Sequence, residues 1–201
     1  MSALILGLLA CGNEKKATTE LIKVTTGVEA INDSFTTHSQ HWKSYSGHWQ
    51  FKNKELLQDS IDNSYPVLLR VDKSFSDLDL SIDFKPISGE VDASGGLIFR
   101  AEDEDNYYIV RANALEGNFR LYTFTDGLRH QLASASVTPP ALSQFHQIRV
   151  IAKGNHIQAF LNGKLEIDYH DDQFKKGYSG LWTKADSVTV FDNFKVVELL
   201  K

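Results

Sequence analysis

"LDLSIDFK", Leu78 to Lys85, is the stretch that decides the fold. Apolar residues occupy every second position and alternate with polar ones: Leu78, Leu80, Ile82 and Phe84 against Asp79, Ser81, Asp83 and Lys85. Successive side chains of a β-strand point to opposite faces of a sheet, so a period of two predicts a strand with one buried face.

The same period recurs along the rest of the chain, around Ile148–Val150, Ile157–Leu161 and Leu165–Tyr169. Between such runs, Asn162-Gly163 and Asp126-Gly127 supply the positive φ angles that tight hairpins need. No stretch beyond the first 30 residues has a clear helical period. Many short strands separated by turn signals predict an all-β fold, an antiparallel two-sheet sandwich.

Composition limits the partners of the protein. The 201 residues suffice for one domain, and 42% of them are hydrophobic, which excludes a globally disordered chain. The net charge is −5, and no basic stripe marks a nucleic-acid surface. We therefore predict no nucleic-acid partner.

The N-terminus reads "MSALILGLLAC" and resembles a bacterial lipoprotein signal in which Leu8-Leu9-Ala10 precedes Cys11. This predicts a signal peptide at 1–10, a tether at 11–30 with Cys11 lipidated, and the sandwich domain at 31–201. No Lys or Arg precedes the apolar run, so the alternative is an apolar terminus with an incidental buried cysteine. The run is far shorter than the roughly 20 residues that span a bilayer.

The hairpin "GGLIFRAEDEDNYYIVRAN", Gly95 to Asn113, predicts the ligand-binding face. Pairing across the turn Glu102–Asp105 gives one face to core residues, among them Leu97, Phe99, Tyr108 and Val110. The opposite face would hold Arg100, Tyr107, Arg111 and Asn113 around open space at Gly96. Arginine and tyrosine there suit polyols or carboxylates. The alternative is that both arginines pair with acids of the sheet itself, such as Asp79 or Asp83.

A second segment, "GLWTKADSVTVFDNFKV" at Gly180 to Val196, adds a family resemblance. With "DNYYIVRAN", "GLIFR" and "FLNGK", it is similar to the concanavalin A-like lectin/glucanase superfamily, and within it to bacterial proteins with a 3-keto-disaccharide hydrolase domain. The resemblance covers about Phe35 to Val197. It implies a jelly roll with a curved sugar-facing sheet, and Lys184 and Asp186 join the candidate ligand-binding residues.

The superfamily contains lectins, accessory modules and enzymes, so its fold does not settle an activity. Glycoside hydrolysis needs two carboxylates about 5 to 9.5 Å apart. The acidic string Glu102–Asp105 falls in a turn and is interpreted as solvated, which leaves Asp186 and Asp168 as catalytic candidates without a motif. A glycoside-cleaving hydrolase of the 3-keto-disaccharide hydrolase type and a purely structural envelope protein are the two alternatives to a glycan-binding protein.

One carboxylate raises the question of a metal. Asp192 interrupts the apolar row of Val188, Val190, Phe194 and Val196, and a buried carboxylate is costly unless it is paired or metal-bound. With Asp33 from the first strand, it predicts a structural calcium site. A bulge at Phe191 that turns Asp192 outward is the alternative. His38, His41 and His48 lack a zinc-binding frame, and we expect no required cofactor.

The sequence thus predicts a monomeric lipoprotein of the bacterial cell envelope, anchored through Cys11 at the outer membrane or facing the periplasm. Its sandwich domain is expected to recognise a glycan or oligosaccharide.

Overall fold

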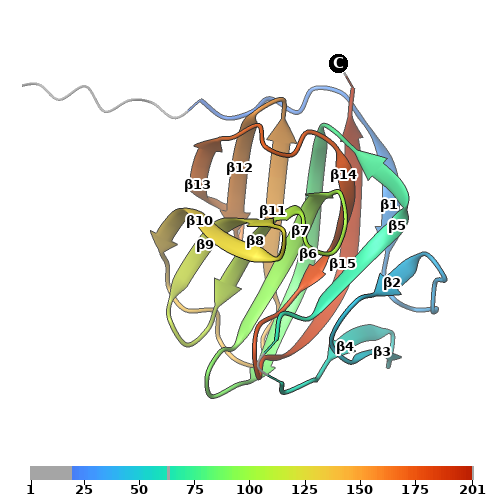
Figure 1. Cartoon of the computed structure of the whole chain (residues 1–201), viewed down its shortest axis with the longest axis vertical. Helices are drawn as coiled ribbons and strands as arrows, with labels where there is room; N and C mark the ends of the chain where they lie inside the picture. Colours follow the sequence, from blue (N-terminus) through green and yellow to red (C-terminus); the bar gives the residue numbers. More distant parts are fainter. Residues whose placement is uncertain (1–19, 63, 201) are drawn as a thin grey trace, which may run out of the picture.

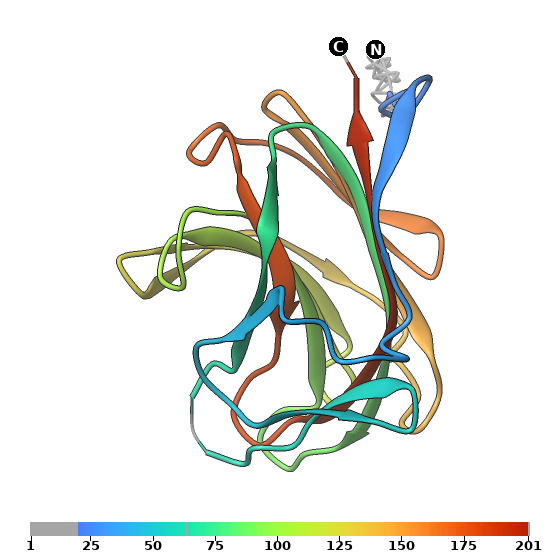
Figure 2. The same ribbon diagram turned by 90° about the vertical axis from the view of Figure 1, so that its right-hand side faces the viewer.

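The computed structural model describes residues 20–62 and 64–200, and within these ranges the chain forms strands and loops without a helix. Two antiparallel sheets pack face to face, as predicted (Figures 1 and 2). Sheet A contains eight strands: β1 (Gly27–Asp33), β3 (Trp49–Lys52), β4 (Glu55–Gln58), β6 (Leu78–Ser88), β11 (His146–Lys153), β12 (His156–Leu161), β13 (Lys164–His170) and β15 (Val188–Leu199).

Sheet B contains seven strands, in the order β10-β9-β8-β7-β14-β5-β2. Their bounds are β2 (Trp42–Ser44), β5 (Val67–Phe75), β7 (Ser94–Ala101), β8 (Tyr107–Asn113), β9 (Asn118–Thr125), β10 (Leu128–Ser136) and β14 (Gly177–Trp182). The non-sequential order, in which β7 and β5 flank β14, is that of a jelly roll and confirms the predicted fold class.

The main core lies between the sheets and follows the alternation of the sequence. Leu78, Leu80, Ile82 and Phe84 of β6 are fully buried, as are Leu97, Phe99, Tyr108 and Val110 of sheet B. The predicted pairing of the opening hairpin is confirmed, with Leu97 opposite Val110 and Phe99 opposite Tyr108. Removing these apolar side chains from water is the main stabilising contribution to such a fold.

The predicted turns have the expected backbone. Asp126 and Gly127 have φ of 51° and 73°, and Asn162 and Gly163 have φ of 50° and 79°. The first pair joins β9 to β10 and the second joins β12 to β13. The dipeptides therefore set the register next to each turn, which places Arg129 opposite Phe124 in the first hairpin. Further from the turns the register shifts, between Gln131 and Ala133 in the first hairpin and between Ala159 and Phe160 in the second.

The N-terminal part of the described chain lies on sheet A. β1 begins at Gly27, upstream of the predicted domain start at Ile31, and runs antiparallel to the last strand, β15 (Figure 2). Residues 1–19, with the predicted signal peptide and Cys11, lie outside the described residues. No helix of the described residues has the length and apolar character needed to cross a membrane.

Candidate ligand-binding site on the outer face of sheet B

The face of sheet B that points away from the core carries a second apolar cluster. Its members are at most 3% exposed: Val67, Leu69, Ile98, Ala101, Tyr107, Ile109, Tyr122, Phe124 and Trp182. Tyr45 and Tyr65, from the segments around β2 and β5, pack against this cluster and are themselves partly exposed. The outer face of sheet B is thus an aromatic surface that Tyr45 and Tyr65 partly cover.

The rings form a continuous arrangement. Tyr65 stacks on Trp182 at a centroid distance of 5.5 Å and meets Phe124 edge-on at 5.2 Å. Tyr107 stacks on Phe124 at 4.7 Å. The Arg129 guanidinium lies over the rings of both Tyr65 and Tyr122, at 5.3 and 4.8 Å, so a cation closes the aromatic group.

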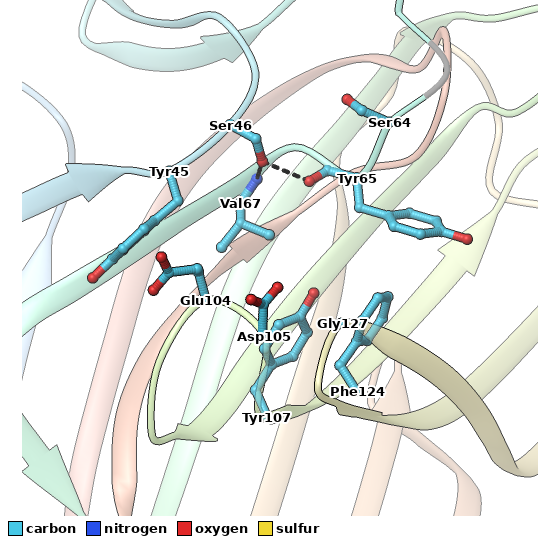
Figure 3. A pocket seen from close by; sticks show the side chains of 10 residues that line it. All are labelled: Tyr45, Ser46, Ser64, Tyr65, Val67, Glu104, Asp105, Tyr107, Phe124 and Gly127. Atoms are coloured by element: carbon cyan, nitrogen blue, oxygen red, sulfur yellow. Dashed lines mark hydrogen bonds between the residues drawn. The ribbon is translucent and has the colours of Figure 1, made fainter.

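A cavity of about 310 Å³ opens at this place (Figure 3). Its walls combine aromatic rings with two carboxylates: Tyr45, Tyr65, Tyr107 and Phe124, and Glu104 and Asp105. The carboxylates belong to the β7–β8 turn, which docks on the β9–β10 turn. Gly127 N donates to Asp105 O at 3.1 Å, and Asp126 N donates to Asn106 Oδ1 at 3.0 Å.

The interpretation of the acidic turn Glu102–Asp105 as a solvated surface is incomplete. Glu104 and Asp105 are exposed, but they line the cavity. Neither carboxylate accepts a hydrogen bond from any described residue, whereas Asp103 in the same turn accepts from Asn106. Two free carboxylates therefore face a cavity walled by rings.

A charged group lies further along the same face, in the row Trp182, Gly96, Arg111 and Arg120 of four adjacent strands. Arg111 Nη1 is 3.3 Å from Asp92 Oδ2, and Arg111 Nη2 is 3.1 Å from Glu116 Oε2. Burial lowers the pKa of Arg111, but the charge of Asp92 and the neighbouring acceptors outweigh it, so the net pKa is raised. Arg111 is a permanent buried cation.

Four buried donors on this face remain unpaired. Arg111 Nε, Asn113 Nδ2, Arg129 Nη1 and Trp182 Nε1 have no hydrogen-bond partner among the described residues. Buried polar groups without a partner are rare in proteins and call for water or a ligand. Their concentration on one face marks that face as a candidate site.

Arg100 does not belong to this face, and the prediction that placed it there is wrong. It has φ of 51°, and the pairing of β7 with β14 shifts register beside it. Its guanidinium instead donates to Ser76 O at 2.8 Å and to Phe174 O at 3.3 Å, near Asp77 at 3.6 Å. Arg100 therefore fastens loops at the end of the sandwich.

The prediction of an exposed polar face around Gly96 is also wrong in part. Gly96 does lie opposite Arg111, but a Cβ there would meet Ile109 Cδ1 at 2.6 Å and Trp182 Cε3 at 3.2 Å, so no open space exists. Tyr107 and Arg111 are each only 1% exposed. Arg111 is paired with acids, as the alternative reading held, although the acids are Asp92 and Glu116 rather than Asp79 or Asp83.

The other predicted ligand-binding residues, Asn113, Lys184 and Asp186, contact other residues of the protein itself. Asn113 is buried, and its Oδ1 accepts from Leu115 N at 2.8 Å. Lys184 Nζ lies 3.3 Å from Asp92. The Asp186 carboxylate accepts backbone N–H groups of the loop 90–92, which lower its pKa, with Glu90 as the strongest contributor. Asp186 is therefore an ionised group engaged in loop structure.

The two predicted catalytic candidates lie in different places. Asp186 follows β14 on the sheet B side, whereas Asp168 lies on β13 of sheet A, hydrogen-bonded to His156 at 2.6 Å. They do not converge on one cavity. Asp92 and Glu116, which converge on Arg111, carry no sequence motif; Arg129 has one signal, the Asp126-Gly127 hairpin that places it opposite Phe124.

The residues predicted for calcium have other partners. Asp33 accepts from Trp42 Nε1 at 2.9 Å and from Arg70 Nη1 at 2.8 Å. Asp192 lies opposite Asp83 of β6, next to a bulge between Asp192 and Lys195 where Asn193 has φ of 55°. Burial, then Asp83 and Glu55, raises the pKa of Asp192. The bulge of the alternative reading thus exists, displaced from Phe191, and calcium binding stays a prediction.

Known proteins place this geometry in context. The chain is similar to levanase of Bacillus subtilis (strain 168), at 26% identity over 162 residues, 79% of this chain but 23% of levanase. It therefore spans about a quarter of that relative. Among solved structures, carbohydrate binding module CBM66 from Bacillus subtilis matches at a TM-score of 0.70 and 26% identity, covering 77% of this chain and 93% of that one.

The Bacillus licheniformis beta-glucanase has the same fold at a TM-score of 0.60 and 12% identity, covering 88% of this chain and 100% of that one. The family of 3-keto-alpha-glucoside-1,2-lyase-like domains matches residues 29–197, which confirms the resemblance expected from the sequence. Since that match spans most of the chain, the protein belongs to the family of 3-keto-alpha-glucoside-1,2-lyase-like domains.

Proposed function

We propose that the protein binds carbohydrate in the cavity on the outer face of sheet B. The observation that carries this proposal is the cavity wall itself, in which Tyr65, Tyr107 and Phe124 stand beside the free carboxylates of Glu104 and Asp105. The 26% identity to a carbohydrate binding module and to levanase supports the same class of ligand.

The chemistry of the walls suits a sugar. A pyranose or furanose ring presents apolar C–H groups that pack on aromatic rings, and hydroxyl groups that donate to carboxylates. Hydrogen bonds to charged groups contribute about 1.5–3 kcal/mol each when they are shielded from water. The Arg129 guanidinium lies over the Tyr65 ring, 5.3 Å from its centroid, and supports this wall of the cavity.

The experiment measures binding of levan and of a mixed-linkage β-glucan to the full chain, by calorimetry or affinity electrophoresis. Tyr65→Ala and Asp105→Ala should each weaken binding about tenfold or more, since tenfold corresponds to about 1.4 kcal/mol. Glu102→Ala is the matched control, because Glu102 is exposed in the same turn and does not line the cavity. Equal binding by all three variants would refute the proposal.

A second candidate function is glycoside cleavage by the same cavity. The specific observation is that two carboxylates line it, since glycosidic bond hydrolysis uses a pair of them. Product analysis after long incubation with each bound glycan separates the two functions. New reducing ends that disappear in both Glu104→Gln and Asp105→Asn favour the enzyme; binding without products favours a binding protein; neither binding nor products favours a structural protein.

We further propose that the protein is a monomeric lipoprotein of the bacterial cell envelope, at the outer membrane or facing the periplasm. The support is the sequence Leu8-Leu9-Ala10-Cys11, in which Cys11 is the only cysteine. Cys11→Ser should move the protein from the membrane pellet to the soluble fraction. Unchanged fractionation, or an unmodified N-terminal peptide in mass spectrometry, contradicts the anchor.

A further inference from the structure

The β12–β13 hairpin forms one edge of sheet A (Figure 1). Its outer face carries a cluster of metal-ligating side chains. His156 pairs with His170 across the hairpin, and Gln158 pairs with Asp168, so these four side chains share one face. Ligand atoms of His156, Asp168 and His170 all lie within 4.8 Å of one another. Among residues 20–62 and 64–200, this is the one such group of three.

The two imidazoles are arranged as a pair. Their rings stack at a centroid distance of 4.3 Å with an interplanar angle of 9°. Imidazole nitrogens offer lone pairs to a cation. His156 Nε2 lies 2.6 Å from Asp168 Oδ1, so a nitrogen and an oxygen ligand are already adjacent.

A buried glutamine holds the carboxylate in place. Gln158 is 0% exposed, and its Nε2 donates to Asp168 Oδ2 at 3.0 Å and to Glu20 O at 2.9 Å. Its Oε1 accepts from Ile22 N at 2.9 Å, which joins the N-terminal segment to the hairpin. Outer hydrogen bonds of this kind orient metal ligands. They fix Oδ2 and leave Oδ1 on the side of the imidazoles.

The surroundings are open and of mixed charge. His156 lines a depression of about 300 Å³ with Glu20, Lys23 and Lys153. Lys153 is also the cross-strand neighbour of His156 on β11, and both lysines oppose a cation there. Asp168 and Glu20 offset them. Water can reach the cluster and complete the coordination of a bound ion.

We propose that His156, Asp168 and His170 form a binding site for a divalent transition-metal ion of the Zn²⁺ class. Two imidazole nitrogens and one carboxylate oxygen with a free position match the ligands of zinc, whereas calcium takes oxygen ligands only. The site is on sheet A, on the side of the sandwich opposite the sugar cavity. A bound ion would link the two strands of the edge hairpin where the N-terminal segment crosses it.

The test is calorimetric titration of the untagged full chain with ZnCl₂ in a non-chelating buffer. We expect a single saturable site, and at least about tenfold weaker binding in His156→Ala, His170→Ala and Asp168→Asn, since each removes a ligand. At the same zinc concentration, the melting temperature should rise more in the wild type than in these variants. Co²⁺ should give a visible absorption band that each variant loses or alters.

His130→Ala is the control, because His130 is exposed on β10 and lies outside the cluster. Circular dichroism checks each variant; should His156→Ala unfold, His170→Ala at the exposed end of β13 decides the question. Absence of saturable zinc binding, or unchanged binding in every folded cluster variant, would overturn the proposal. Any zinc bound by Cys11 is the same in the wild type and in every variant, so it does not affect the difference between them.

Discussion

Arg111 and Arg149 occupy equivalent places in the two sheets, yet their surroundings differ. Each lies on a β-strand inside its sheet and points away from the core. Arg149 is 39% exposed in its side chain and holds Asp79 through two short hydrogen bonds of 2.7 and 2.6 Å. The Arg111 side chain is 1% exposed, makes contacts of 3.1 Å or longer to two acids, and leaves Nε unpaired.

The difference favours the outer face of sheet B as the place where a sugar binds. On sheet A, Arg149 completes its hydrogen bonds with the neighbouring strand and meets water, as ordinary surface residues do. On sheet B, cations and aromatic rings are buried beside a cavity without full pairing, although incomplete pairing of buried groups is costly. A bound ligand that supplies the missing hydrogen bonds would offset this cost.

The largest expected effect is that of Arg111→Ala. Removing this cation leaves Asp92, which is 0% exposed, with Lys184 as its remaining charged neighbour. Breaking a buried ion pair costs about 3–5 kcal/mol, and we expect the lower end because Lys184 stays. Arg149→Ala should cost only about 0–1 kcal/mol. Urea unfolding of both variants measures this, and equal losses would remove the contrast between the faces.

The sequence predicts the frame of this site better than its chemistry. Alternation along Leu78–Lys85 and the turn dipeptides fix strands and register, because both depend on local spacing. The same alternation places Arg111 on the outer face correctly, but it cannot show that Tyr65 and loop 90–92 fold over that face and bury it. The alternation misplaces Arg100 because the positive φ of Arg100 itself interrupts the regular strand geometry.

A smaller effect is expected from Glu116→Gln. A hydrogen bond from Asn118, followed by Arg111 and Arg120, lowers the pKa of Glu116, whose side chain is 38% exposed. Since the folded-state pKa is below the unfolded one, ionised Glu116 stabilises the protein above about pH 4.5, and this contribution is lost as the pH falls through the folded value. The variant should lose less than about 1 kcal/mol at pH 7 and nothing at pH 2. A loss that is equal at both pH values contradicts this reading.

The smallest effect is that of Asp192→Asn on sheet A. Burial and the nearby Asp83 and Glu55 raise its pKa, so its ionisation costs stability. The protonated carboxyl group of Asp192 contributes to the stability of the folded protein. This contribution is complete below the unfolded pKa of about 4 and is lost as the pH rises through the folded pKa. The variant should therefore melt slightly higher than the wild type at pH 7 in calcium-free buffer, and equally at pH 3.

Added calcium sharpens the same experiment. If Asp192 holds calcium, the ion should raise the melting temperature of the wild type and not of Asp192→Asn. Identical melting curves of the wild type with and without calcium would refute the calcium prediction.

Ligand binding by the outer face of sheet B is tested most directly by one comparison of three proteins. The dissociation constant for levan and for β-glucan is measured for the wild type, Arg129→Ala and Arg149→Ala. Arg129→Ala removes the cation between Tyr65 and Tyr122 and should weaken glycan binding about tenfold or more, whereas Arg149→Ala should leave it unchanged. Equal affinities for all three proteins, or a loss confined to Arg149→Ala, would contradict the account.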